Sequence, residues 1–441
     1  GMSSSAQTTR TWAAGASGQW TQANNWSGGV APVTGDTVVF NGTASVTSLP
    51  ASISLGGMQI SGNVTLTRNS ASTITVTNML RVDSTFTLTL GSGPVSLTLA
   101  STATGTLRGS VSVAGTFAND GNLIIGSASA ISGAGAFSLG SAATLQIASP
   151  DGIAGTTSGN IRVSGTRTLP TSANYILNGS SSQSTGTGFP STITGSLSIN
   201  NPNTVTLSSS LTLSGVLNLN QGTFNIGSAL SLGSTVINRS GGAFSGTPAG
   251  STAYTVNYTG ASKNTGTEMA LSGGTLRRVT VNLNSGASLT LDASRTVSDT
   301  LALSSGVVNT GTSTLTLNGA VLTGGSSSSY VNGKLQRRFL SGGNLTFPIG
   351  SSSGYLPVTI NYASGAGTVT ASTTNGDISG TTPAQINLSN SVNRFWSFTN
   401  SGFSASAYTA TVNWLSADRD GGYDEANAGI GNFANSAWSY L

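Results

Sequence analysis

The chain has 441 residues, of which only 6% are charged, and it contains neither cysteine nor histidine. These absences exclude disulfides, a cysteine nucleophile, a histidine-based catalytic triad and a histidine-ligated metal. The formal net charge of +4 is the difference between 16 basic and 12 acidic residues, and the basic residues are scattered along the chain. Because phosphate binding needs a basic face, we expect no nucleic-acid partner.

Apolar residues make up 37% of the chain, and 60 residues are glycine. Disordered chains lack this apolar content, so the composition favours many short strands joined by tight turns. No apolar run approaches the ~20 residues that cross a bilayer, so we expect no direct membrane span. Gly1 and Met2 are typical of a cloned start, and we expect the export signal and the anchor to lie outside this sequence.

Residues 1–44 are predicted to form an N-terminal cap. The run TWAAGASGQWTQANNWSGGVAPVTGDTVVF begins at Thr11 and contains Trp12, Trp20 and Trp26. A stack of strands needs a covered end, because exposed strand edges and core invite pairing with another chain. We therefore interpret this aromatic segment as a cover for the first coil.

Residues 45–334 are predicted to form a β-solenoid built from repeats of roughly 80 residues. The run VTLSSSLTLSGVLNLNQGTFNIG from Val205 aligns without a gap with LTLDASRTVSDTLALSSGVVNTG from Leu289, and Gly222 matches Gly306. The pieces LTL, LNL and FNI within the first copy alternate apolar and polar residues, as strands with one buried face do. Glycine, asparagine or serine separates them, as turns require.

Such short strands bury a face only when coil stacks on coil. We therefore predict an all-β fold, a parallel β-solenoid wound as a right-handed β-helix with coils of ~20 residues. A series of antiparallel sandwiches or barrels is the competing architecture. Residues 335–441 have longer, more aromatic strands, including GYLPVTINY, NRFWSF and AYTATVNWL, and are predicted to form a small antiparallel β-sandwich.

The run from Asn174 to Phe224 resembles repeats of large β-helical surface proteins of Bacteroidota. The pattern VNGKLQRRF, FPIG, YLPVTI and NRFWSF resembles the small β domain that follows such repeats, and NWSGGVAPVTGDTVVF resembles the opening of adhesin and autotransporter-like passengers. The resemblance implies export, display at the cell surface and often a C-terminal sorting domain. It supplies no catalytic residues.

Without histidine or cysteine, paired carboxylates that act on sugars are the remaining catalytic route. The acidic residues of the predicted solenoid are Asp83, Asp120, Asp151, Glu268, Asp292 and Asp299. Asp292 and Asp299 are the nearest pair, but the other repeat copy has Ser208 and Gly215 at these places. We interpret both as turn acids that can pair with Arg295, and we expect no enzyme and no catalytic residue.

A candidate calcium site lies in the run DRDGGYDE, which contains Asp418, Asp420, Asp424 and Glu425. Carboxylate oxygens are the ligands that calcium prefers. The spacing departs from an EF-hand loop, since Gly421 and Gly422 come too early and no acid closes the loop. A polar turn between two strands is the competing interpretation, and no other cofactor is expected.

The sequence thus favours a non-catalytic extracellular structural or adhesive module of a larger surface protein, monomeric as this chain. Its expected partners are a host or neighbouring cell surface, or an extracellular glycan. Two alternatives stay open. One is a β-helix protein that binds or degrades polysaccharides. The other is an ice-binding adhesin region, since runs such as Thr65-Leu66-Thr67 recur, although threonine is also simply a good strand residue.

Overall fold

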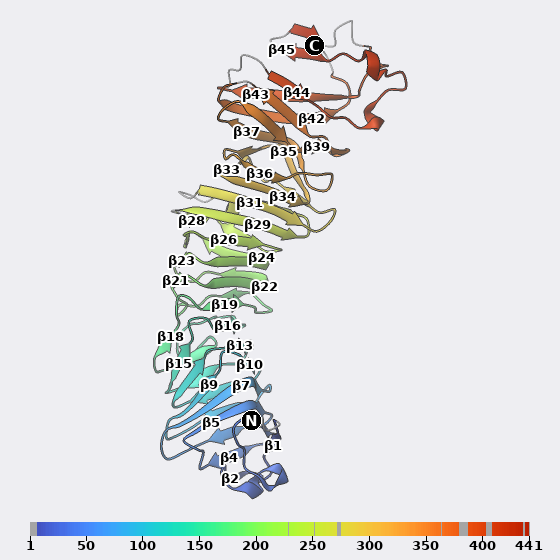
Figure 1. Ribbon diagram of the computed structural model, residues 1–441. Coiled ribbons are helices and arrows are strands. Elements are labelled where there is room, and N and C mark those ends of the chain that lie inside the picture. Colours follow the sequence, from blue (N-terminus) through green and yellow to red (C-terminus); the bar gives the residue numbers. More distant parts are fainter. Residues whose placement is uncertain are drawn as a thin grey trace. The chain divides into compact units, whose positions relative to one another are not determined.

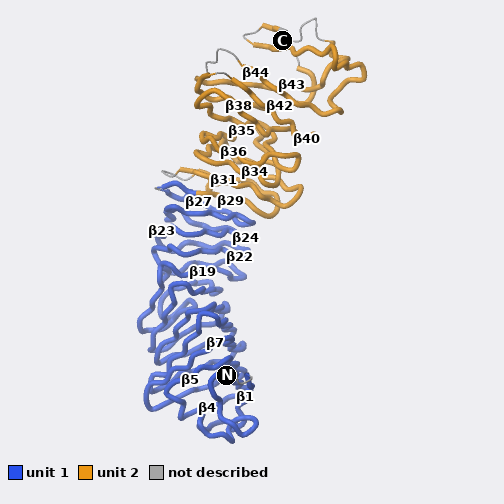
Figure 2. The backbone as a smooth tube through the Cα atoms, viewed as in Figure 1, with its two compact units in different colours: residues 1–254, 271–274 blue, residues 255–270, 275–441 orange. Residues whose placement is uncertain are grey.

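The computed structural model describes residues 7–227, 229–250, 252–270, 275–362, 364–378, 387–402, 408–434 and 437–440. The fold is all-β: a parallel β-solenoid of about 15 turns is followed by small antiparallel sheets, as the sequence predicts (Figure 1). The chain divides into two compact units at Tyr254 and Thr255 (Figure 2).

The first unit winds through three strand positions in each coil. Its strands are β1 (Thr9–Thr11), β2 (Ser17–Gln19), β3 (Thr37–Phe40), β4 (Ala44–Thr47), β5 (Ser52–Ile60), β6 (Val64–Leu66), β7 (Ser72–Val82), β8 (Thr87–Leu90), β9 (Val95–Leu99), β10 (Thr104–Leu107), β11 (Ser110–Val113), β12 (Thr116–Asn119), β13 (Asn122–Ile125), β14 (Ile131–Gly133), β15 (Ala136–Leu139), β16 (Thr144–Ile147), β17 (Ile161–Val163), β18 (Arg167–Thr168), β19 (Asn174–Leu177), β20 (Gln183–Ser184), β21 (Thr192–Ile193), β22 (Ser196–Thr206), β23 (Leu211–Leu213), β24 (Val216–Gly227), β25 (Leu230–Leu232), β26 (Val236–Arg239), β27 (Ala243–Gly246) and β28 (Ala249–Gly250).

Alternation along each strand builds the core of this unit. In β24, Leu217 and Leu219 are fully buried. Leu217 pairs with Leu197 in the preceding coil and with Ile237 in the next one, and both pairings are parallel. The 20-residue interval between these partners is the predicted coil length. Burial of each aliphatic side chain contributes about 1.5–3 kcal/mol to the stability of the fold. Because these side chains are buried against those of the neighbouring coils, the core forms only when coils stack.

Glycines turn the chain between strand positions. Gly222 has φ 66°, and a Cβ there would lie 2.1 Å from the carbonyl oxygen of Asn201. Gly306, its partner in the aligned repeat, has φ 95°. Both therefore adopt a left-handed backbone conformation that other residues rarely tolerate. The aligned copies thus turn the chain in the same way.

Aromatic side chains cluster in the N-terminal segment of the first unit, where the sequence predicts a cap. Trp26 lies with its ring centroid 4.9 Å from that of Trp20, 5.1 Å from Trp12 and 5.6 Å from Phe40. The parallel pairing already begins in this segment, because β1 pairs with β3 and β2 pairs with β4. The residues expected to form the cap therefore also supply the first coil.

The second unit continues with parallel strands and ends in antiparallel ones. Its strands are β29 (Ala253–Gly260), β30 (Lys263–Asn264), β31 (Thr275–Leu283), β32 (Ser288–Thr290), β33 (Arg295–Val297), β34 (Thr300–Ser305), β35 (Val307–Leu317), β36 (Val321–Gly324), β37 (Val331–Phe339), β38 (Gly343–Phe347), β39 (Ile349–Ser351), β40 (Gly354–Tyr355), β41 (Val358–Tyr362), β42 (Gly367–Asn375), β43 (Arg394–Ser401), β44 (Tyr408–Thr411), β45 (Gly431–Ala434) and β46 (Ala437–Tyr440).

Strand β37 is the point where the pairing changes. It pairs in parallel with β35 and β39, and antiparallel with β42, which in turn pairs with β43. Two smaller antiparallel sheets combine β38, β41 and β44, and β45 with β46. Parallel pairing throughout the strands of the first unit, and among β30 to β37 and β39 of the second, excludes the competing series of antiparallel sandwiches or barrels. The direction in which the coils wind stays a prediction.

The helical segments of the described chain are short 3₁₀ turns. They are η1 (Ala23–Asn25), η2 (Ser27–Gly29), η3 (Thr267–Met269), η4 (Ser416–Asp418) and η5 (Glu425–Asn427). Among the described residues, no helix has the length and apolar character needed to cross a membrane.

Candidate functional site

Asp418, the first acid of the predicted calcium loop, is the partner of a buried arginine. Arg394 donates from Nε to Oδ2 at 2.7 Å and from Nη2 to Oδ1 at 2.9 Å. The Arg394 side chain is fully buried, and that of Asp418 is 9% exposed. The backbone N–H of Leu415 also donates to Asp418. These bonds occupy both carboxylate oxygens.

Asp420 ties the same loop to the segment before β43. It accepts hydrogen bonds from the backbone N–H of Ser391 at 2.9 Å and from the side-chain amide of Asn393 at 2.8 Å. The N–H of Ser391, followed by the Asn393 amide, holds the pKa of Asp420 below its usual value. This carboxylate therefore stays ionised at neutral pH, and its hydrogen bonds hold the loop against the segment before β43.

Asp424 and Glu425 are exposed and bond within their own loop. Asp424 accepts from the backbone N–H of Ala426 at 3.1 Å, and Glu425 pairs with Arg419 at 3.0 Å. Within the described part of the chain, no three acidic side chains gather closely enough to hold a metal ion. The loop brings the predicted ligands near one another in sequence but gives each a different partner.

We expect millimolar calcium to leave the melting temperature of the chain unchanged. Calcium takes about six to eight oxygen ligands, and taking Asp418 from Arg394 would leave a buried cation uncompensated. Thermal melts in calcium and in EDTA provide the measurement. A calcium-dependent rise in melting temperature that the substitution Asp420→Asn abolishes would contradict this expectation.

Asp292 and Asp299 each pair with a different arginine. Asp292 pairs with Arg295 at 2.5 Å, as the sequence predicts. The predicted pairing of Asp299 with Arg295 is wrong, because Asp299 pairs with Arg277 at 3.1 Å. Burial alone would raise the pKa of Asp292, but hydrogen bonds from Arg295 and Thr265 hold it below its usual value. Both acids are therefore engaged as ion-pair partners, and the pKa of Asp292 is lowered, whereas a general acid needs a raised one.

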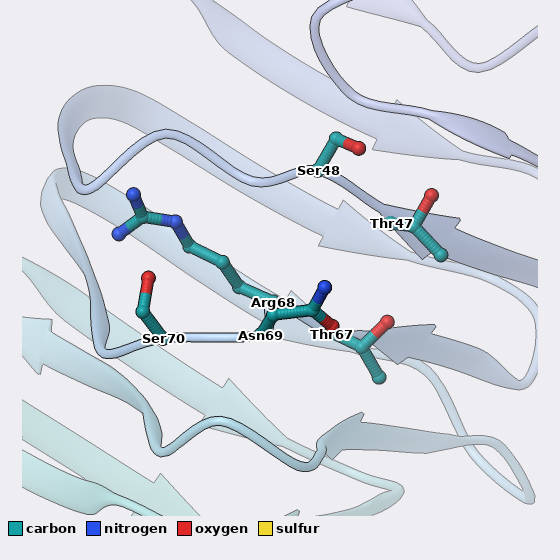
Figure 3. Close-up of a pocket in the computed structure, with 6 residues that line it drawn as sticks. All are labelled: Thr47, Ser48, Thr67, Arg68, Asn69 and Ser70. Carbon is teal, nitrogen blue, oxygen red and sulfur yellow. The ribbon is translucent and has the colours of Figure 1, made fainter.

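Two surface hollows, one in each unit, are lined by polar side chains. One, of about 450 Å³, lies between neighbouring turns of the first unit and is lined by Thr47, Ser48, Thr67, Arg68, Asn69 and Ser70 (Figure 3). Arg68 extends away from the threonines, and its Nη1 donates to the carbonyl oxygen of Ala71. A second hollow, of about 230 Å³, lies beside the Arg277–Asp299 pair. Ligand pockets are usually lined mainly by apolar and aromatic side chains, which both hollows lack.

Hydroxyl side chains form rows across the outward face of β5, β7, β9, β12, β15 and β18. The register places one row in the order Ser54, Thr75, Thr98, Ala118, Ser138 and Thr168. Ala118 interrupts the hydroxyls of this row. Ala136 interrupts the neighbouring row, where it pairs with Thr116. This face therefore offers no unbroken threonine ladder of the kind that the ice-binding alternative needs.

Side-chain amides form a second kind of row, which the sequence patterns did not single out. Asn238 donates from Nδ2 to Oδ1 of Asn218 at 2.9 Å, and Asn218 donates to Oγ of Ser198 at 3.0 Å. These residues recur at 20-residue intervals, the coil length. That interval is the signal that could have revealed the row.

The chain was compared with family models, curated proteins and solved structures. The comparisons found no matching family model, no matching curated protein and no matching solved structure. The fold and the residues themselves therefore carry the functional argument.

Proposed function

We propose that this chain is a non-catalytic structural or adhesive module of a larger surface protein, which presents the faces of its coils outside the cell. The observation that carries the proposal is the stack of parallel coils with neutral outward rows. Hydroxyl rows cover one face of the first unit and amide rows another. Repeated coils of this kind create extended binding surfaces.

The chemistry of the chain suits an exposed position. It has no histidine, the side chain that ordinarily changes charge between pH 5 and 8. The described acids at Asp36, Asp83, Asp292, Asp299 and Asp418 are all paired with arginine. A surface of hydroxyl and amide side chains therefore stays uncharged as the external pH changes.

The resemblance to β-helical surface proteins of Bacteroidota supports an extracellular location. In such an arrangement the solenoid would space or present its faces, and the partner would be a host or neighbouring cell surface, or an extracellular glycan.

Surface display tests this proposal. The full chain is fused to an outer-surface anchor on a bacterial cell, and attachment of the cells to glycan-coated and cell-coated surfaces is measured under flow. We expect more attached cells than with the anchor carrying a flexible linker of equal length. Equal attachment, or hydrolysis of any polysaccharide by the purified chain, would refute the proposal.

A further inference from the structure

Consecutive coils of the first unit present one continuous uncharged surface. It is formed by β13, β16, β19, β22, β24 and β26, which follow one another in parallel register (Figure 1). We name it the amide face, and the residues of its two outward rows are Asn122, Ile124, Thr144, Gln146, Asn174, Ile176, Ser196, Ser198, Val216, Asn218, Val236 and Asn238, of which Ser198 is buried. None of these side chains carries a charge.

Hydrogen bonds between coils fix the amides of this face. Near β13 and β16, Gln146 donates to Asn122 at 3.0 Å and accepts from Asn178 at 3.2 Å. Near β24, Asn218 donates to Ser198 and accepts from Asn238. Each bond sets the rotamer of a side chain that would otherwise be mobile. A ligand that binds these amides therefore loses little further side-chain entropy.

Asn218 keeps part of its hydrogen-bonding capacity for a ligand. An asparagine amide has two N–H donors and an oxygen with two lone pairs. In Asn218 one N–H goes to Ser198 and one lone pair accepts from Asn238. One donor and one acceptor remain on a half-buried side chain. This pattern suits a hydroxyl group, which donates and accepts at once.

Aliphatic side chains lie beside the amides. Val216 and Val236 form the row next to Asn218 and Asn238, and each is half-buried. On β24 and β26 the face therefore places two valines beside two asparagines, and in the earlier coils Ile124 and Ile176 lie in the same row as Gln146. A sugar ring in a chain has the same two kinds of group, since its hydroxyls are polar and its C–H groups are apolar.

The absence of charge on the amide face selects the class of ligand. An acidic glycan or a nucleic acid would need basic side chains, and protein interfaces are enriched in aromatic residues and arginine. Neighbouring coils are ~4.8 Å apart, so the face spans roughly 24 Å along the stack. We infer that the amide face binds a neutral polysaccharide chain that lies along the stack. This inference rests on the proposed adhesive function and names its partner.

Asparagine substitutions on two faces of one strand test the inference. Asn218→Ala removes a central amide of the face. Asn225→Ala is the control, because Asn225 lies on the same strand, β24, but pairs with Thr206 and Ser245 on another face. The probes are xyloglucan, mannan and β-1,3-glucan, with polygalacturonate and heparin as charged controls, all tested on the full chain by affinity electrophoresis and calorimetry.

We expect the wild-type chain to bind at least one neutral polysaccharide, and Asn218→Ala to weaken that binding about tenfold while Asn225→Ala leaves it unchanged. If Asn218→Ala fails to fold, Val236→Ser tests the apolar side chains of the face in its place. The inference is overturned if no neutral polysaccharide binds, if only charged ones bind, or if both asparagine variants bind equally. It is also overturned if light scattering shows a dimer that Asn218→Ala dissociates, since a second copy would then cover the face.

The display experiment separates this inference from the proposed function. Cells displaying Asn218→Ala that attach as well as wild type would overturn the inference and leave the adhesive module intact. Wild-type chains that give no attachment would refute the adhesive module itself.

Discussion

Replacing Asp418 with asparagine should destabilise the C-terminal antiparallel sheets by about 3–5 kcal/mol. The substitution keeps the shape of the side chain but removes the charge that compensates Arg394. The Arg394 side chain is fully buried, so it cannot regain water without opening the structure. Ser351, Ser353 and Thr373 also bond to this guanidinium through neutral hydroxyls, which do not replace a carboxylate.

Hydrogen–deuterium exchange of β42 and β43 measures this effect, because the Arg394 bonds join both strands to the loop at Asp418. The control is Glu425→Gln in the same loop. Glu425 is 64% exposed where it pairs with Arg419, and exposed pairs contribute about 0–1 kcal/mol. Faster exchange should appear in the Asp418 variant alone. Equal exchange in the two variants would show that the Arg394–Asp418 pair does not hold the sheets together.

The same pair predicts how stability depends on pH. Hydrogen bonds from Arg394, with that of Leu415 and the arginine charge, hold the pKa of Asp418 below its usual value against the opposing effect of burial. A carboxyl with a lowered folded pKa contributes stability that is complete above its unfolded pKa of about 3.9. The contribution is lost as the pH falls through the folded value. Melting temperatures from pH 7 to pH 2 should therefore fall more steeply for wild type than for Asp418→Asn.

The periodicity of the sequence was enough to predict the solenoid. Alternation at Leu217, Leu219 and Phe224 reports one buried face, and the 20-residue interval to Ile237 reports the coil. These signals are local or recur at a nearly regular interval, so a single sequence contains them. The change at β37 is different, because that strand pairs in parallel with β35 and antiparallel with β42. Only tertiary contacts decide where one pattern gives way to the other.

The acidic loop shows why site prediction was harder than fold prediction. Asp418 and Asp420 are close in sequence, which suggested a shared ligand. Each instead bonds to a residue more than twenty positions earlier, Arg394 in one case and Asn393 in the other. No spacing rule within the loop reveals such partners. The structure supplies a competing role for each of these acids, and the melts in calcium and in EDTA test the site itself.

Replacing Trp26 with alanine should cost about 3–5 kcal/mol and expose the N-terminal end of the first unit. Trp26 is only 2% exposed and contacts Trp12, Trp20 and Phe40. Its Nε1 also donates to the carbonyl oxygen of Trp20 at 2.8 Å. Loss of the indole would remove the cover of the first coil, and uncovered strand edges pair with other chains.

Phe117→Ala separates the loss of cover from the loss of volume. Phe117 is fully buried and stacks on Phe137 at 6.1 Å in the middle of the first unit, so its removal should cost a similar 3–5 kcal/mol. Chemical denaturation should show comparable destabilisation in both variants. Light scattering should show concentration-dependent self-association for Trp26→Ala alone, because only that variant opens an end of the stack. Self-association of both variants would mean that general destabilisation causes it, and that the aromatic cluster has no special role as a cover.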